Sequence, residues 1–85
     1  MIAQFATPFV RLQEYLTWAR SEGCKVQSGF VSGPDGTVSF IVVTAPSGRY
    51  AVIHDLEPDE AIPAYAYRQY DRRLGLTSPF GKPNH

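Results

Sequence analysis

Tyrosine and arginine side chains gather in the last third of this chain, and they are its groups best suited to binding chemistry. Arg68 and Arg72 are four residues apart, so on a helix they share one face, with Tyr65 about one turn before them. Guanidinium groups bind phosphate or carboxylate through paired hydrogen bonds, and tyrosine is enriched where proteins contact their partners. The predicted binding site therefore consists of Tyr65, Arg68, Arg72 and Arg73, extended by Arg49 and Phe80.

The same segment also has a structural interpretation, because its charges follow the order that stabilises a helix. Asp59 and Glu60 precede the predicted helix and the arginines lie near its end, which complements the helix dipole. Asp71 can also pair with Arg68 on the helix surface. On this interpretation the segment is a solvated helix face, and both interpretations stay open at this point.

The other aromatic residues divide between the core and the surface. Tyr67, Tyr70 and Leu74 have the three- and four-residue spacing of a core-facing stripe. Tyr65 is then expected to point outward, where an exposed tyrosine is typical of an interface. Trp18 lies off the apolar stripe of the first predicted helix, so it is either a core-edge residue or a contact anchor.

His54 and Asp55 are the best candidates for a general base with an orienting acid, and Asp59 and Glu60 follow closely. A metal site needs several converging ligands, and the other histidine, His85, is the last residue of the chain. We therefore interpret His54 as a structural residue. We expect no catalytic residue, no bound metal and no cofactor.

Length and composition restrict the class of protein. The 85 residues allow one domain, and a hydrophobic content of 44% is sufficient for a packed core. Eight basic and eight acidic residues cancel, which argues against general binding to nucleic acid. The single cysteine, Cys24, is predicted to be a small buried residue at a strand start, and it favours a reducing, cytoplasmic location. The sequence shows neither a signal peptide nor an apolar run of about 20 residues that would span a membrane.

Apolar spacing and turn residues predict two helices. The first is expected from Pro8 to Glu22, because Thr7-Pro8 is a helix start and apolar residues recur at helical spacing after it. The second is expected from Pro63 to Leu74, with Gly75-Leu76 as its C-terminal cap.

Three strands are expected between the helices, at Cys24–Val31, Thr37–Thr44 and Arg49–His54. The middle strand is apolar on both faces, which is typical of a central strand. The segments Gly33–Gly36 and Ala45–Gly48 contain proline and glycine and are predicted to form tight turns, so that the strands form an antiparallel meander.

The predicted fold is α+β, with the order helix, three-stranded antiparallel meander, helix, and with both helices on one sheet face. Residues 1–76 are expected to form the domain and residues 77–85 an extended tail, with Phe80 packed on the body. The other face of the sheet is expected to be partly open.

This order of elements, over Pro8 to Leu76, resembles the double-stranded RNA-binding domain and the small HicA-type toxin fold. The RNA-binding family has a lysine-rich motif at the start of its second helix, where this chain has Glu57, Asp59 and Glu60. The toxin family depends on a histidine in its first hairpin, where this chain has Gln27–Phe30 without one. The resemblance therefore implies the topology, and neither family's function follows from it.

These features predict a small non-enzymatic binding module, acting as a cytoplasmic accessory, regulator or inhibitor; its size alone suggests an origin in a phage or mobile element. The expected partner is a protein with an acidic patch. A second copy of the chain is a further candidate, because pairing would cover the open sheet face. Nucleic-acid binding through the same arginines is the alternative, and no membrane contact is expected.

Overall fold

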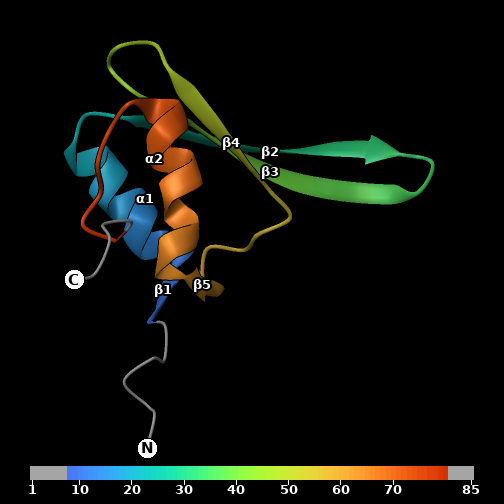
Figure 1. Cartoon of the computed structure of the whole chain (residues 1–85). Helices are drawn as coiled ribbons and strands as arrows, with labels where there is room; N and C mark the ends of the chain where they lie inside the picture. The colour runs from blue at the N-terminus through green and yellow to red at the C-terminus, as the bar shows by residue number, and fades with distance from the viewer. Residues whose placement is uncertain (1–7, 81–85) are drawn as a thin grey trace, which may run out of the picture.

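The computed structural model describes residues 8–80, in which two helices pack against one face of a three-stranded antiparallel sheet (Figure 1). The helices are α1 (Leu12–Ser21) and α2 (Arg68–Leu74). The strands are β2 (Lys25–Gly33), β3 (Gly36–Thr44) and β4 (Tyr50–His54), with β3 in the centre. Helix α1 packs on β2 and α2 on β4, so the predicted α+β architecture is confirmed.

The β2–β3 hairpin is longer than the part of the sheet that the helices cover. Its pairing runs from Lys25 opposite Thr44 to Gly33 opposite Gly36, whose φ of 122° suits only glycine. In Figure 1 the turn end of the hairpin extends well beyond both helices. Phe30 lies in this extension and is 75% exposed, because neither helix reaches it.

A second, two-stranded sheet lies at the starts of the two helical segments. Strand β1 (Phe9–Arg11) pairs antiparallel with β5 (Ala61–Pro63), with Val10 opposite Ile62. The sequence pattern did not reveal this pairing, because a three-residue strand is too short to show a period. Its backbone groups find their partners about fifty residues away in the sequence.

Both predicted helix starts are therefore wrong. Residues after Pro8 form β1, and α1 begins only at Leu12. Pro63 ends β5, and a 3₁₀ turn, Ala64–Tyr67, leads into α2. A proline in a short edge strand leaves no ladder donor unpaired, which explains why Pro63 is accepted there.

The acidic loop before β5 closes on the start of α1. The backbone amides of Leu12 and Gln13, in the first turn of α1, donate to the backbone carbonyls of Glu60 and Pro58, at 2.9 and 2.8 Å. The Glu60 carboxyl group accepts from the amide of Glu57 at 2.9 Å and holds the loop's own turn. These contacts supply partners for a helix N-terminus that would otherwise have none, so this loop serves α1 and not, as predicted, the second helix.

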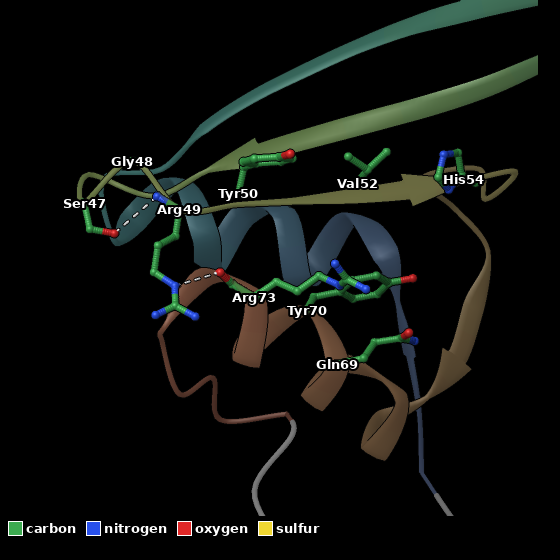
Figure 2. A pocket seen from close by; sticks show the side chains of 9 residues that line it. All are labelled: Ser47, Gly48, Arg49, Tyr50, Val52, His54, Gln69, Tyr70 and Arg73. Atoms are coloured by element: carbon green, nitrogen blue, oxygen red, sulfur yellow. Dashed lines mark hydrogen bonds between the residues drawn. The ribbon is translucent and has the colours of Figure 1, made fainter.

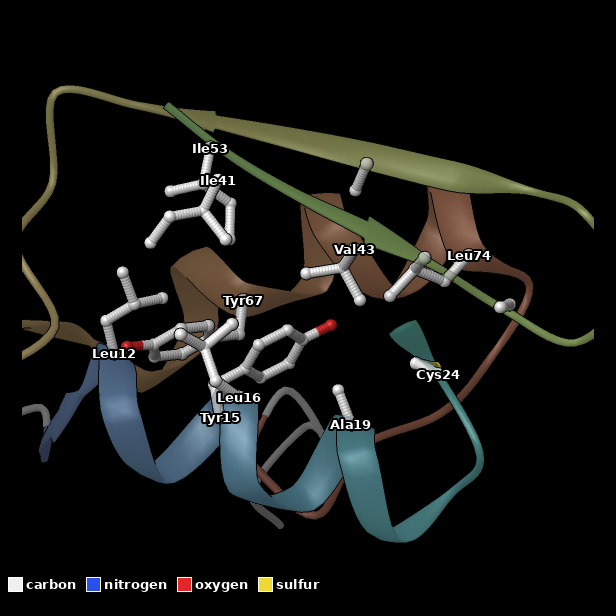
Figure 3. Packing of buried hydrophobic residues seen from close by; sticks show 12 residues of the cluster. Leu12, Tyr15, Leu16, Ala19, Cys24, Ile41, Val43, Ile53, Tyr67 and Leu74 are labelled. Atoms are coloured by element: carbon white, nitrogen blue, oxygen red, sulfur yellow. The ribbon is translucent and has the colours of Figure 1, made fainter. Parts of the chain in front are cut away.

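The core lies between the sheet and the two helices (Figure 3). Helix α1 contributes a stripe at helical spacing, and β3 and β4 contribute alternate residues facing it. The fully or nearly buried side chains include Leu12, Tyr15, Leu16, Ala19, Cys24, Ile41, Val43, Ala51, Ile53, Tyr67 and Leu74. The predicted core positions of Tyr67 and Leu74 are confirmed, while Tyr70 is half-buried and packs against this cluster.

Two tyrosines stack at the centre of the core. The rings of Tyr15 and Tyr67 have centroids 4.6 Å apart and an interplanar angle of 16°. The hydroxyl of Tyr67 donates to the carbonyl of Val10 at 2.8 Å, which ties β1 to the core. Trp18 lies at the core edge, with its ring centroid 5.4 Å from that of Tyr15.

Asp71 is the buried polar centre of the fold, at 7% exposure. The Tyr15 hydroxyl donates to one carboxyl oxygen at 2.7 Å. The amide and hydroxyl of Ser78 donate to the other oxygen at 3.0 and 2.8 Å. The predicted pairing of Asp71 with Arg68 is therefore wrong, because Asp71 faces inward and joins α1, α2 and the segment after α2.

Helix α2 ends as the sequence predicts. Gly75 has a φ of 72°, and the amides of Gly75 and Leu76 donate to the carbonyls of Arg72 and Asp71 at 3.3 and 3.0 Å. This is the Schellman arrangement, in which a left-handed residue supplies partners for the last carbonyls of the helix. It also turns the chain so that Ser78 reaches Asp71.

Unfolding should become easier at alkaline pH. Burial and the hydrogen bond to Asp71 raise the pKa of Tyr15 well above its ordinary value, and burial raises that of Tyr67 to about 12. Above about pH 10 the unfolded chain releases tyrosine protons that the folded chain retains, so stability falls as the pH rises. Urea unfolding followed by circular dichroism should show this decline. In Tyr15→Phe the decline should be shallower, by at most about 1.4 kcal/mol per pH unit. Identical slopes in the two proteins would contradict the buried Tyr15 hydroxyl.

Candidate functional site

Three of the predicted site residues form an exposed stripe along the helical segment. Tyr65, in the 3₁₀ turn, is 62% exposed, and Arg68 and Arg72 of α2 are both exposed. Their spacing places them on the side of α2 away from the sheet, as the sequence predicts. The stripe is therefore available to a partner, and its binding role stays a prediction.

Arg49 has a structural partner at the end of α2. Its guanidinium group donates from Nε to the carbonyl of Arg73 and from Nη2 to the carbonyl of Arg72, both at 3.0 Å. A cation that binds the last carbonyls of a helix also complements the helix dipole. Arg49 thus connects the start of β4 to α2, and its side chain crosses Gly75, where an added Cβ would lie 3.2 Å from Arg49 Cδ.

Phe80 packs on the body, as expected of the tail. Its ring centroid lies 6.1 Å from the centroids of both Tyr15 and Tyr67, in tilted arrangements, and it is half-buried. Together with Ser78, it holds the described part of the tail against the two helices. Phe80 is therefore part of the aromatic cluster that closes the core.

Arg73 lies on a different side of α2 from the stripe. With Gln69 and Tyr70 it lines a hollow of about 1000 Å³ between α2 and β4. Figure 2 shows these side chains below the strand, while the β4 side chains Tyr50, Val52 and His54 stand above it. The predicted cluster therefore splits into an exposed stripe, a helix cap, a packed phenylalanine and this hollow.

The candidate catalytic residues do not converge. His54 is exposed at the end of β4, and Asp55 follows with a left-handed φ of 55°. Within residues 8–80, no three His, Cys, Asp or Glu side chains lie close enough to hold a metal ion, and His85 lies outside that range. Cys24 is buried, as predicted, and burial raises the pKa of its thiol.

The face of the sheet away from the helices carries a continuous apolar surface. The pairing registers place Val31 beside Val38 and Val42 beside Val52, and they place Phe40 between Gly29 on one side and His54 on the other. We call this the open face. Its centre is a hollow of about 440 Å³ lined by Val31, Val38, Phe40, Val42, Val52 and His54.

A glycine shapes the open face. The outer end of the Phe40 ring lies over Gly29 on the neighbouring strand, where an added Cβ would be 2.8 Å from Phe40 Cζ. An aromatic ring over a strand glycine shields backbone that has no side chain of its own. A larger residue at position 29 would therefore displace the Phe40 ring. The sequence predicts a middle strand that is apolar on both faces and a partly open second face, and within residues 8–80 both helices pack on the opposite face.

Comparison with protein-family models, with curated proteins and with solved structures finds no match to this chain. Within residues 8–80, neither helix is long and apolar enough to cross a membrane.

Removing the Arg49 cap should destabilise the fold. Arg49→Met keeps most of the apolar stem but loses both hydrogen bonds to α2, at a cost of about 1 kcal/mol. For a domain of this size that corresponds to a fall in Tm of about 4–8 °C, measurable by thermal unfolding. Arg68→Met is the matched control, since that arginine is exposed and its side chain makes no hydrogen bond within residues 8–80. Equal Tm values for the two variants would contradict the cap.

Proposed function

We propose that this chain is a small protein-binding domain that acts by association and catalyses no reaction. The observation that carries the proposal is the open face: Val31 and Val38 are 60% and 40% exposed, and Phe40, Val42 and Val52 beside them are only half-buried. Monomeric proteins rarely expose contiguous apolar surfaces of this kind, and such surfaces usually mark sites of association.

The charges of the open face favour a second copy of the chain as its partner. Strands β2, β3 and β4 contain no Asp or Glu, and Lys25, at one end of β2, is their one formal charge. Lys25, opposite Thr44, stands at the margin of the open face, and the rest of that face offers a charged partner no complementary formal charge. Two copies can meet with little electrostatic cost and remove both apolar faces from water.

Such a dimer would have its helices on the outside. Because α1 and α2 cover the opposite face of each sheet, pairing through the open faces leaves the stripe of Tyr65, Arg68 and Arg72 exposed on both copies. The stripe then remains free for a protein with an acidic patch, in keeping with a role as an accessory, regulator or inhibitor. Arginine and tyrosine are the residues that most often dominate such contacts.

The dimer should form reversibly and depend on concentration, because the open face is small compared with a standard interface. Sedimentation velocity over a wide concentration range should show a monomer–dimer equilibrium. Val42→Lys should give a monomer at every concentration, because it places a charge at the centre of the open face. Thr37→Lys, on the other face of the same strand, should still dimerise. A wild-type chain that stays monomeric throughout would refute pairing through the open face.

The protein-binding proposal also predicts that the arginine stripe does not bind nucleic acid. Gel shifts with RNA and DNA at low salt should show no retarded band, because the chain has no net positive charge. Nucleic-acid binding gains much of its free energy from the counterions that cationic side chains release from phosphates. A retarded band that disappears with added salt and in Arg68→Ala/Arg72→Ala would instead assign the stripe to phosphate binding.

A further inference from the structure

Within residues 8–80, the outer edge of β4 carries backbone groups that have no hydrogen-bond partner. Towards β3, the carbonyl of Arg49 accepts from Ala45 at 2.7 Å and the amide of Asp55 donates to Ser39 at 3.0 Å. Backbone groups in an antiparallel pair point alternately towards and away from the partner strand. In the register of β3 and β4, Ala51 and Ile53 therefore also bond to β3.

The remaining β4 residues, Tyr50, Val52 and His54, direct their amides and carbonyls away from β3. No hydrogen bond to these groups exists within residues 8–80. An unpaired strand edge is a template for a further strand, and most proteins cover or shorten such edges. In the described part of the chain, the edge is open along the whole of β4.

The hollow between β4 and α2 runs along this same edge (Figure 2). Arg73 and Arg49 line it together with His54, and its lining residues include no Asp or Glu. The Arg49 guanidinium keeps its charge while bound to the helix carbonyls. The edge therefore combines free backbone donors and acceptors with a cationic wall.

We propose that this edge binds an extended acidic segment of a partner protein as a fourth strand of the sheet. Backbone hydrogen bonds to Tyr50, Val52 and His54 would supply affinity, and Arg73 would select carboxylate side chains of the segment. A second copy is disfavoured at this edge, because pairing β4 with β4 would bring two sets of Arg49 and Arg73 together. The inference goes beyond pairing through the open face, since it uses the strand edge.

The test is a binding titration by fluorescence anisotropy. The probe is a labelled peptide of about seven residues in which Glu and Val alternate, long enough to pair along the five residues of β4. It should bind saturably and lose affinity with added salt, whereas a Lys–Val peptide should not bind. Arg73→Glu should weaken binding about tenfold, because charge reversal turns an attraction into a repulsion of similar size. Arg20→Glu, in the exposed last turn of α1 and outside the hollow, is the matched control and should change affinity little.

Amide hydrogen exchange followed by NMR locates the bound peptide. The amides of Tyr50, Val52 and His54 should exchange rapidly in the free chain and become protected with the peptide. Those of Ala51 and Ile53 should be protected in both states. Val52→Pro should abolish binding and leave the β3–β4 pairing intact, because it removes an outward amide. If this variant does not fold, the exchange pattern and the affinity of Arg73→Glu still test whether the peptide binds at this edge.

Three results would overturn the proposal: no binding at low salt, equal affinity in Arg73→Glu and Arg20→Glu, or binding that leaves the three outward amides unprotected. Protection of these amides in the free chain that rises with protein concentration would assign the edge to a second copy. Val42→Lys separates this site from the open face, since it should remove dimerisation and leave peptide binding unchanged.

Discussion

The fold depends on the buried carboxyl group of Asp71. It accepts hydrogen bonds from Tyr15 of α1 and from Ser78 after α2, so one side chain connects three segments that are distant in the sequence. An unpaired carboxyl group at this depth would be costly, and its partners hold the segments in one arrangement. The Gly75 cap makes the arrangement attainable, because it turns the chain back towards Asp71. The stacked rings of Tyr15 and Tyr67 exclude water around it.

A second constraint is that two short helices cover only one face of the sheet. Their buried apolar side chains pack on that face, and within residues 8–80 the open face and the far end of the β2–β3 hairpin keep exposed apolar side chains. The edge of β4 is left open within residues 8–80, because this part of the chain provides no further strand beside it. The proposed binding surfaces therefore follow from the small number of elements in an 85-residue chain.

Local patterns predicted the parts of the fold that depend on neighbouring residues. Alternation located β2, β3 and β4, and Gly75 marked the end of α2, because a strand period and a left-handed cap are properties of a short segment. The β1–β5 pairing and the late start of both helices could not be predicted, since they result from hydrogen bonds between distant residues. Phe9 and Leu12 have helical spacing in the sequence. The backbone from Phe9 to Arg11 pairs with β5, however, so the helix begins only at Leu12.

The candidate site divides in the same way. The sequence by itself determined that Tyr65, Arg68 and Arg72 share an outward helix face, because helical geometry places residues three and four apart together. Only the tertiary structure decided that Arg49 caps α2, that Phe80 closes the aromatic cluster, and that Arg73 faces the edge of β4. These roles depend on which distant segments meet in the folded chain. Hydrogen bonding and burial between those segments determine their meeting, and the spacing of side chains along the chain does not.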